Sequence, residues 1–316
     1  MADISLVDPE LRPMLETFPP FAFSAEALPL IRGAMGAMLA PADLATDAPQ
    51  REERFIPGPA GAPDVRVLIW RPAGAQGPLP AIFHMHGGGY VLGSPEMMAA
   101  EHSSLVAALT CVIVSVDYRL APEAPHPAPI EDCYAALKWT YANADSLGID
   151  PARLGISGES AGGGLAAALA LIARDRGEVP LAFQHLIFPM IDDRTCTRAD
   201  PHPHTGGYIW TAESNAFGWA ALLGHAPGGA EGDAYAAAAR ATDLAGLPPT
   251  FIAVGALDLF LDENLDYALR LTRAGVATEL HVYPGAFHGF QSASHTRIAR
   301  KANADSRDAL AQFLRQ

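Results

Sequence analysis

The feature that most constrains the fold of this chain is the alternation of short apolar runs with longer helical patterns. Helical patterns cover residues 128–144, 161–175 and 262–275. Near-continuous apolar strands that alternate with helices predict an α/β fold, with a mostly parallel central sheet covered by helices on both faces. The expected strands are 65–70, 81–86, 112–117, 153–157, 183–188, 250–256 and 278–284.

Two segments interrupt this alternation. Residues 1–50 contain two helical patterns, at 9–18 and 25–40, before any expected strand. Residues 194–229 are rich in histidine, proline, glycine and aromatic residues. In α/β sheets, extra segments that follow strands tend to lie over the carboxyl ends, where ligands bind. We therefore expect 1–50 and 194–229 to form a cap over one α/β domain, built from 51–193 and 230–316.

Composition excludes several classes of function. The formal net charge of -14 opposes binding to nucleic acid or to anionic lipid. The acidic start, MADISLVDPE, lacks the features of a signal peptide, and the apolar run 161–173 is too short and glycine-rich for a membrane span. The three widely spaced cysteines form neither a disulfide framework nor a metal pattern. We expect a cytoplasmic protein without membrane insertion, metal or cofactor.

Residues 158–162, GESAG, lie between an expected strand and an expected helix. A sharp strand-to-helix turn of this kind holds its serine in a strained backbone, and the flanking glycines avoid clashes with neighbouring chain. The turn directs the Ser160 hydroxyl outwards at the start of a helix, where N–H groups and the helix dipole favour negative charge. Ser160 is therefore the candidate nucleophile.

A serine hydroxyl needs a base, and the base needs an orienting group. Asp258 and His288 each follow an expected strand, so both should lie at the same edge of the sheet as Ser160. The order serine, acid, histidine is that of an α/β-hydrolase triad. Asp262 and Glu263 are alternative acids, but they are placed to begin the next helix, where acidic residues suit the dipole.

The stretch 84–90, HMHGGGY, ends an expected strand with three consecutive glycines. Glycine permits positive φ and a close approach to the backbone, so these residues predict that a group binds against their N–H groups. An alkoxide formed at a carbonyl attacked by Ser160 is such a group. Two glycine N–H groups, joined by that of Ala161, would form an oxyanion hole. His86 is expected to brace this loop.

The chain carries several recognisable motifs in order: HGGG, DYRLAPE at 117–123, GESAGG at 158–163, GLPPTFIAVGALDLFLDE at 246–263 and FHGF at 287–290. Together they resemble the motifs of the hormone-sensitive-lipase family of bacterial carboxylesterases. The resemblance covers roughly residues 60–315. It implies an α/β-hydrolase fold with a helical cap, and oxyanion donors at Gly88, Gly89 and Ala161. Glu159 departs from the family, whose members commonly have Asp or Thr there.

The resulting hypothesis is a serine carboxylesterase that acts on short- to medium-chain esters through an acyl-enzyme. An amidase or peptidase with the same triad, and a non-catalytic ligand-binding α/β-hydrolase, are the alternatives. A small ester is the expected partner, and a homodimer stays open as an alternative to a monomer. Aromatic residues are expected to wall the pocket and limit acyl length to about two to eight carbons; they are Tyr90, Tyr208, Trp210, Phe217 and Trp219, with Ile209 beside them.

Overall fold

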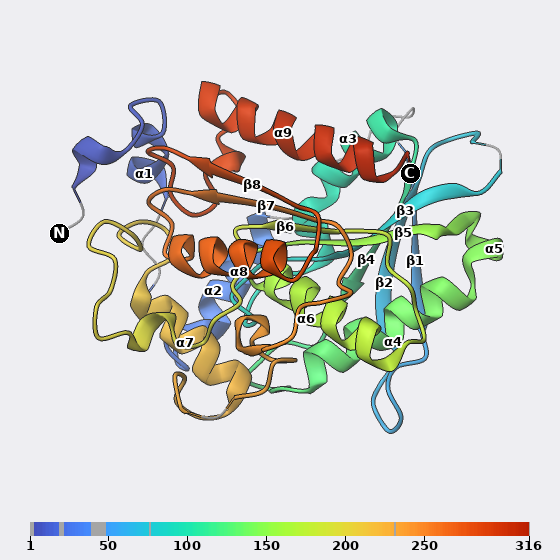
Figure 1. Cartoon of the computed structure of the whole chain (residues 1–316), viewed down its shortest axis with the longest axis horizontal. Coiled ribbons are helices and arrows are strands. Elements are labelled where there is room, and N and C mark those ends of the chain that lie inside the picture. The colour runs from blue at the N-terminus through green and yellow to red at the C-terminus, as the bar shows by residue number, and fades with distance from the viewer. Residues whose placement is uncertain (1–2, 19–21, 39–48, 76, 231, 316) are drawn as a thin grey trace.

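A computed structural model describes residues 3–18, 22–38, 49–75, 77–230 and 232–315. Within these ranges an eight-stranded sheet forms the centre of the molecule (Figure 1). Its order is β1-β2-β4-β3-β5-β6-β7-β8; β2 pairs antiparallel with β1 and β4, and every pair from β4 to β8 is parallel. The predicted mostly parallel sheet is confirmed. The strands are β1 (Gln50–Ile56), β2 (Val65–Arg71), β3 (Leu79–Met85), β4 (Val112–Asp117), β5 (Ile149–Glu159), β6 (Gln184–Ile187), β7 (Thr250–Gly255) and β8 (Thr278–Tyr283).

The first strand is the one that the apolar pattern does not predict. Its sequence, QREERFI, is polar, and only Ile56 in it is buried. β1 is an edge strand that pairs with β2 alone, so its backbone hydrogen bonds rather than an apolar face attach it to the sheet. Charged side chains suit an edge strand because they discourage pairing with another chain.

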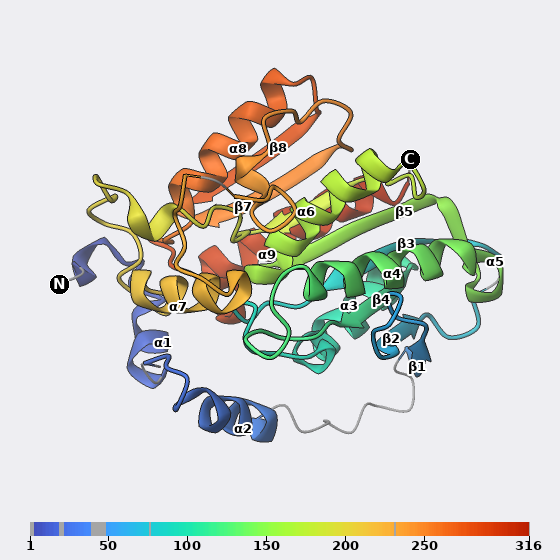
Figure 2. The ribbon, with the colours of Figure 1, turned by 90° about the horizontal axis from the view of Figure 1, so that it is seen from below.

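Helices cover both faces of the sheet, as predicted (Figures 1 and 2). Along β2, alternate side chains enter different cores: Val67 and Ile69 pack on one face, and Leu68 and Trp70 on the other. The first face lies under α4, α6 and α8, and the second under α3 and α9. The helices are α3 (Ala99–Leu109), α4 (Ala128–Ala142), α6 (Ala161–Arg176), α8 (Leu261–Arg273) and α9 (Arg297–Phe313), with the short α5 (Ala144–Leu147). In the described part of the chain, no helix is long and apolar enough to cross a membrane.

Three further helices, α1 (Arg12–Thr17), α2 (Leu28–Met38) and α7 (Ala212–Leu223), gather at one end of the molecule (Figure 2). Two of them touch the loop that follows β3. A Cβ atom added to Gly218 of α7 would lie 2.7 Å from the Gly89 carbonyl oxygen, and Arg32 of α2 donates to the Val91 carbonyl at 2.8 Å. We propose that these helices form the predicted cap; of its first segment, residues 19–21 and 39–48 lie outside the described ranges.

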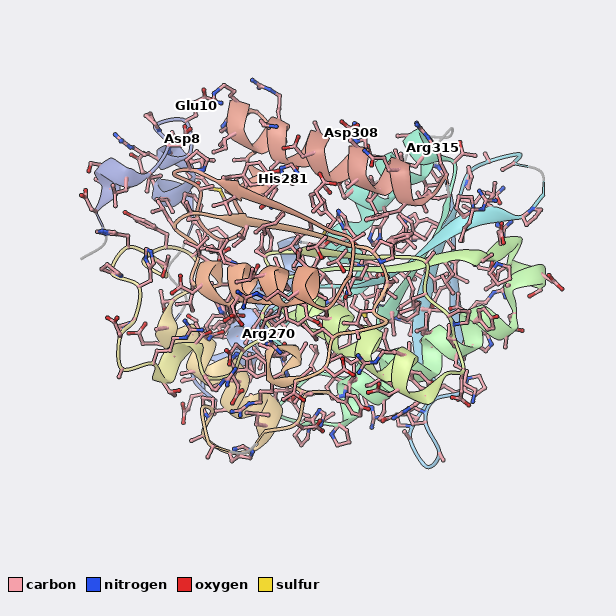
Figure 3. All side chains as sticks on the ribbon, viewed as in Figure 1. Asp8, Glu10, Arg270, His281, Asp308 and Arg315 are labelled. Atoms are coloured by element: carbon pink, nitrogen blue, oxygen red, sulfur yellow. The ribbon has the colours of Figure 1, made fainter. Side chains whose placement is uncertain are left out.

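The beginning of the chain packs against the start of α9 and the loop that follows β8. Asp8 and Glu10 lie next to the first turn of that helix (Figure 3). The Asp8 N–H donates to the Gly285 carbonyl at 3.0 Å, and the Glu10 carboxylate accepts the Arg297 N–H at 2.7 Å. Leu11 is fully buried in the core next to these contacts. The N-terminal segment is therefore attached to the α/β domain before it reaches α2.

Candidate active site

Ser160 occupies a sharp turn between β5 and α6. Its φ of 55° and ψ of -120° lie in a region that a residue with a side chain seldom adopts. Hydrogen bonds hold this conformation: the Ser160 N–H donates to the Ile187 carbonyl at 2.9 Å, and its carbonyl accepts from Gly164 and Met190, both at 2.9 Å. The strained serine predicted from GESAG is therefore present, and the next strand and the helix secure it.

The glycines around Ser160 allow backbone to approach backbone. A Cβ atom at Gly158 would lie 2.3 Å from the Gly162 carbonyl oxygen. A Cβ atom at Gly162 would lie 2.1 Å from the Met85 carbonyl oxygen and 2.5 Å from that of His86. Contacts this short leave no room for a methyl group. The start of α6 therefore packs directly against the end of β3, where the glycine loop begins.

Ser160, His288 and Asp258 form one chain of hydrogen bonds. His288 Nε2 lies 2.9 Å from the Ser160 hydroxyl oxygen, and His288 Nδ1 lies 2.8 Å from Asp258 Oδ2. The other carboxylate oxygen of Asp258 accepts the Phe260 N–H at 3.0 Å. All three side chains are buried. Because a carboxylate only accepts, Nδ1 carries the imidazole proton, and Nε2 is left to accept the hydroxyl hydrogen of Ser160.

The alternative acids lie elsewhere. The Asp262 side chain is 39% exposed and lies 3.6 Å from the Arg198 guanidinium. Glu263 is buried, and its carboxylate accepts the Ile191 N–H at 2.7 Å and the Thr195 hydroxyl. Neither carboxylate is within hydrogen-bond distance of His288. Asp258 is the acid that contacts the histidine.

Aromatic rings enclose the imidazole of His288. The rings of Phe188 and Phe260 meet it edge-on, with centroids 4.6 Å and 5.2 Å away, and Trp210 lies at 6.3 Å. Only 7% of His288 is exposed. This apolar surround fixes the ring plane and leaves Asp258 and Ser160 as its polar neighbours.

The glycine loop passes directly beside Ser160. A Cβ atom at Gly87 would lie 3.5 Å from the Ser160 Cβ. Gly88 and Gly89 both have positive φ, 124° and 60°, which L side chains rarely adopt. Among the described residues, the N–H groups of Gly88, Gly89 and Ala161 donate to no acceptor. Backbone donors of this kind can bind an anion, and the oxyanion hole at these three residues stays a prediction.

His86 lies behind this loop. Its Nδ1 donates to the Gly87 carbonyl at 2.8 Å, and its ring stacks on Tyr118, with centroids 4.3 Å apart. The Tyr118 hydroxyl in turn donates to the His86 carbonyl at 2.7 Å. Burial lowers the pKa of His86 to about 4, so the ring is neutral at pH 7. These contacts are with the backbone of the glycine loop and with Tyr118, and the bracing role of His86 stays a prediction.

The aromatic residues expected to wall the pocket differ in their burial and in their contacts. Tyr90 and Trp219 are completely buried and pack against each other, and the Tyr90 hydroxyl donates to the Met190 carbonyl at 2.7 Å. Trp210 lies over Gly89, because a Cβ atom there would be 2.2 Å from its ring. Tyr208 and Phe217 are partly exposed. Trp210 is the member of the expected wall that touches both the glycine loop and the surround of His288.

The partner of Glu159 is a contact that the sequence did not reveal. His84 Nε2 lies 2.9 Å from Glu159 Oε2, and His84 Nδ1 lies 3.0 Å from the Ser115 hydroxyl. Burial opposes ionisation of Glu159, but the charge and hydrogen bond of His84 outweigh it and hold the carboxyl pKa below its usual value. His84 is 3% exposed. The bond joins the end of β3 to the residue before Ser160, and only the pairing of β3 with β5 could have indicated it.

The chain matches known proteins over most of its length. A protein-family profile described as the alpha/beta hydrolase fold matches residues 82–292. The chain is 34% identical over 288 residues to carboxylesterase NlhH of Mycobacterium tuberculosis, covering 90% of this chain and 88% of the relative. Among solved structures, it is similar to a bacterial heroin esterase, with a TM-score of 0.92, 38% identity and 99% coverage of both chains.

A second solved structure, esterase LipW from Mycobacterium marinum, has a TM-score of 0.85 and 36% identity, covering 98% of this chain and 96% of that one. The family match includes Asp258, His288 and the strand-to-helix turn at Ser160. Both the extent of these matches and the fold confirm the resemblance seen in the sequence motifs. The chain therefore belongs to the hormone-sensitive-lipase-like family of carboxylesterases within the α/β-hydrolase superfamily.

Proposed function

We propose that the protein is a serine carboxylesterase that hydrolyses short- to medium-chain esters through an acyl-enzyme. The observation that carries this proposal is the continuous hydrogen-bonded chain from Asp258 through His288 to Ser160. Its relatives are named as esterases, which supports this reaction class. A non-catalytic ligand-binding protein does not need this chain of bonds to be intact.

In the first half-reaction, the Ser160 oxygen attacks the ester carbonyl carbon, and the hydroxyl proton passes to His288 Nε2. Asp258 stabilises the resulting imidazolium without taking its proton. The carbonyl oxygen becomes an alkoxide and accepts hydrogen bonds from the N–H groups of Gly88, Gly89 and Ala161. When the carbonyl re-forms, the bond to the alcohol oxygen breaks, and His288 donates its proton to that oxygen.

In the second half-reaction, water attacks the acyl group on Ser160. His288 Nε2 takes a proton from this water, and the same N–H groups stabilise the second alkoxide. Collapse of that intermediate releases the carboxylic acid, and His288 returns its proton to the Ser160 oxygen. The enzyme is restored, so no further reactant or cofactor is needed.

Trp210 supports the preference for short acyl chains. Its ring packs on Gly89 and lies beside His288, so it occupies space next to the reacting carbonyl. We expect Trp210→Ala to shift the preference in a p-nitrophenyl ester series towards longer acyl chains. Trp219→Ala is the contrasting variant: because Trp219 is fully buried, it should lose stability without changing the chain-length profile. Identical profiles for wild type and Trp210→Ala would remove Trp210 from the pocket wall.

The nucleophile is tested by Ser160→Ala. This variant should stay folded and lose ester hydrolysis by roughly 10⁴–10⁶-fold. An organophosphate should label Ser160 alone, as mapped by mass spectrometry of the digested protein. Matched p-nitroanilides, assayed beside the esters, distinguish an esterase from an amidase. An active Ser160→Ala protein, or labelling at another serine, would refute the proposed mechanism.

A further inference from the structure

Arg32 connects the N-terminal helix α2 to two loops of the α/β domain. Its Nε donates to the Val91 carbonyl at 2.8 Å, and one terminal nitrogen donates to the Ala121 carbonyl at 2.9 Å. The guanidinium also forms two hydrogen bonds with the Glu123 carboxylate, at 2.7 Å and 3.0 Å. Three partners far from α2 in sequence thus meet on one planar cation.

The first of these partners belongs to the glycine loop. The Gly88 carbonyl accepts the Val91 N–H at 3.1 Å and the Leu92 N–H at 2.9 Å, so residues 88–92 form one tight turn. The Val91 carbonyl and the Leu92 N–H belong to the same peptide unit, and that N–H donates to the Gly88 carbonyl. A displacement of the Val91 carbonyl therefore also displaces Gly88. The donor that binds this carbonyl is the side chain of Arg32.

The second partner is attached to the same turn. The Ala121 N–H donates to the Tyr90 carbonyl at 3.0 Å, while its own carbonyl accepts from Arg32. Leu28 and Ile31 of α2 also form a buried apolar cluster with Val91, Leu92 and Ala121. The loop is consequently held by α2 through both polar and apolar contacts.

We propose that Arg32 is a positioning residue for ester hydrolysis, which fixes the glycine loop so that the Gly88 and Gly89 N–H groups face the alkoxide. This inference rests on the proposed function, because it assigns the oxyanion hole to that loop. Oxyanion donors act within a narrow range of about 2.7–3.1 Å, and a displacement of about 1 Å lowers the rate by about 10²-fold. The N-terminal helix thereby contributes to the chemical step as well as to the cap.

A guanidinium is suited to this task because its N–H groups point in fixed directions in one plane. It can reach two carbonyls and a carboxylate at the same time, whereas an ammonium is a compact charge on a flexible stem. The contact with Glu123 is the outer one: the Glu123 side chain is 64% exposed and that of Arg32 is 27% exposed. The bonds to Val91 and Ala121 should therefore matter most for geometry.

The experiment compares kcat and KM of Arg32→Ala with those of wild type on one short p-nitrophenyl ester. We expect kcat to fall by about 10–100-fold and KM to change little, because the alkoxide exists only along the reaction path. Millimolar guanidinium chloride should restore several-fold of the lost kcat by occupying the vacated space, and sodium chloride at equal ionic strength should not. Glu123→Gln, which keeps both carbonyl contacts, should lose much less.

Arg54→Ala is the matched control, because Arg54 pairs with Glu52 on the edge strand β1 and touches neither α2 nor the glycine loop. Circular dichroism establishes that each variant is folded. If Arg32→Ala does not fold, Arg32→Lys takes its place, with the same expected split between kcat and KM. A folded variant with kcat within twofold of wild type, or with only KM raised, would overturn the inference. Such a result leaves the Ser160-dependent esterase intact, whereas an active Ser160→Ala protein would refute the proposed function itself.

Discussion

Glu159 and His84 are joined by a hydrogen bond, 2.9 Å between Oε2 and Nε2, that links the strand before Ser160 to the strand before the glycine loop. Its position explains how a longer acid replaces the family's usual Asp or Thr: the carboxylate reaches across the sheet from β5 to β3. The strands that lead to Ser160 and to the glycine loop are thus connected twice, by strand pairing and by side chains.

Glu159→Gln should destabilise the protein by about 1–3 kcal/mol, because it removes the carboxylate that strengthens the hydrogen bond to the buried His84 while keeping the side-chain shape. A double-mutant cycle with His84→Asn, measured by urea unfolding, isolates the free energy of interaction between the two side chains. We expect a coupling free energy of about 1 kcal/mol or more. Additive effects of the two substitutions would mean that the pair contributes nothing beyond packing.

The choice of acid is tested by comparing Asp258→Asn with Asp262→Asn. An amide at 258 would present N–H groups to His288 Nδ1, so the imidazole would carry its proton on Nε2 and could not accept one from Ser160. We expect kcat to fall by about 10⁴-fold for Asp258→Asn. Asp262 is half-exposed and does not contact His288, so its variant should keep wild-type kcat. The reverse ranking would show that the wrong acid was chosen.

The role of the glycine loop can be tested with a matched pair of variants. Gly89 and Gly177 have similar φ, 60° and 66°, but a Cβ atom at Gly89 would meet Trp210 at 2.2 Å, whereas nothing lies within 4 Å of one at Gly177. Both alanine variants should lose about 1–2 kcal/mol of stability to the left-handed backbone, and Gly89→Ala should lose more because its methyl group also meets the Trp210 ring. Only Gly89→Ala should also lose kcat, by about 10²-fold or more. Equal kcat for the two variants would place the oxyanion hole elsewhere.

The strands of the sheet could be predicted where burial imposes an apolar pattern. β7, with every residue buried, is recognisable from its sequence, TFIAVG, alone. β1 is not, because it lies at the edge and its residues other than Ile56 are at most partly buried. Its strand conformation comes from backbone hydrogen bonds to β2, which no local pattern of side chains records.

The residues of the candidate site were predictable because each follows a strand and carries a group that the proposed ester hydrolysis requires. Contacts between segments distant in sequence were not predictable. Arg32 and Val91 are 59 positions apart, and His84 and Glu159 are 75 apart, so only the three-dimensional fold identifies these pairs. Residue type alone does not distinguish Tyr90 and Trp219, which are fully buried, from Trp210, which lies over Gly89. The packing of the glycine loop and of α7 decides the direction of each side chain and hence its burial.

Glu263, on the first turn of α8, is a buried acid 2% exposed. It accepts the N–H groups of Ile191 and Asp192 and the Thr195 hydroxyl, so it fixes the start of the segment that leads into α7. Burial and the nearby charge of Asp192 raise its pKa well above the usual value. The folded protein therefore retains a proton on Glu263 at a pH where the unfolded chain has released it.

Stability should consequently decrease as pH rises above about 4.5, until the folded-state pKa is reached, because the unfolded state binds fewer protons there. Glu263→Gln removes this dependence. Over pH 5 to 8, its stability relative to wild type should increase with pH, by at most about 1.4 kcal/mol per unit, as measured by urea unfolding.

Glu96→Gln is the control, because its pKa shift has the opposite sign. Hydrogen bonds from Arg66 lower the pKa of Glu96 to about 2. The stability that Glu96 contributes is therefore lost only as pH falls from about 4.5 towards 2. Its difference from wild type should stay constant over pH 5 to 8. A constant difference for Glu263→Gln as well would show that Glu263 is ionised in the folded protein.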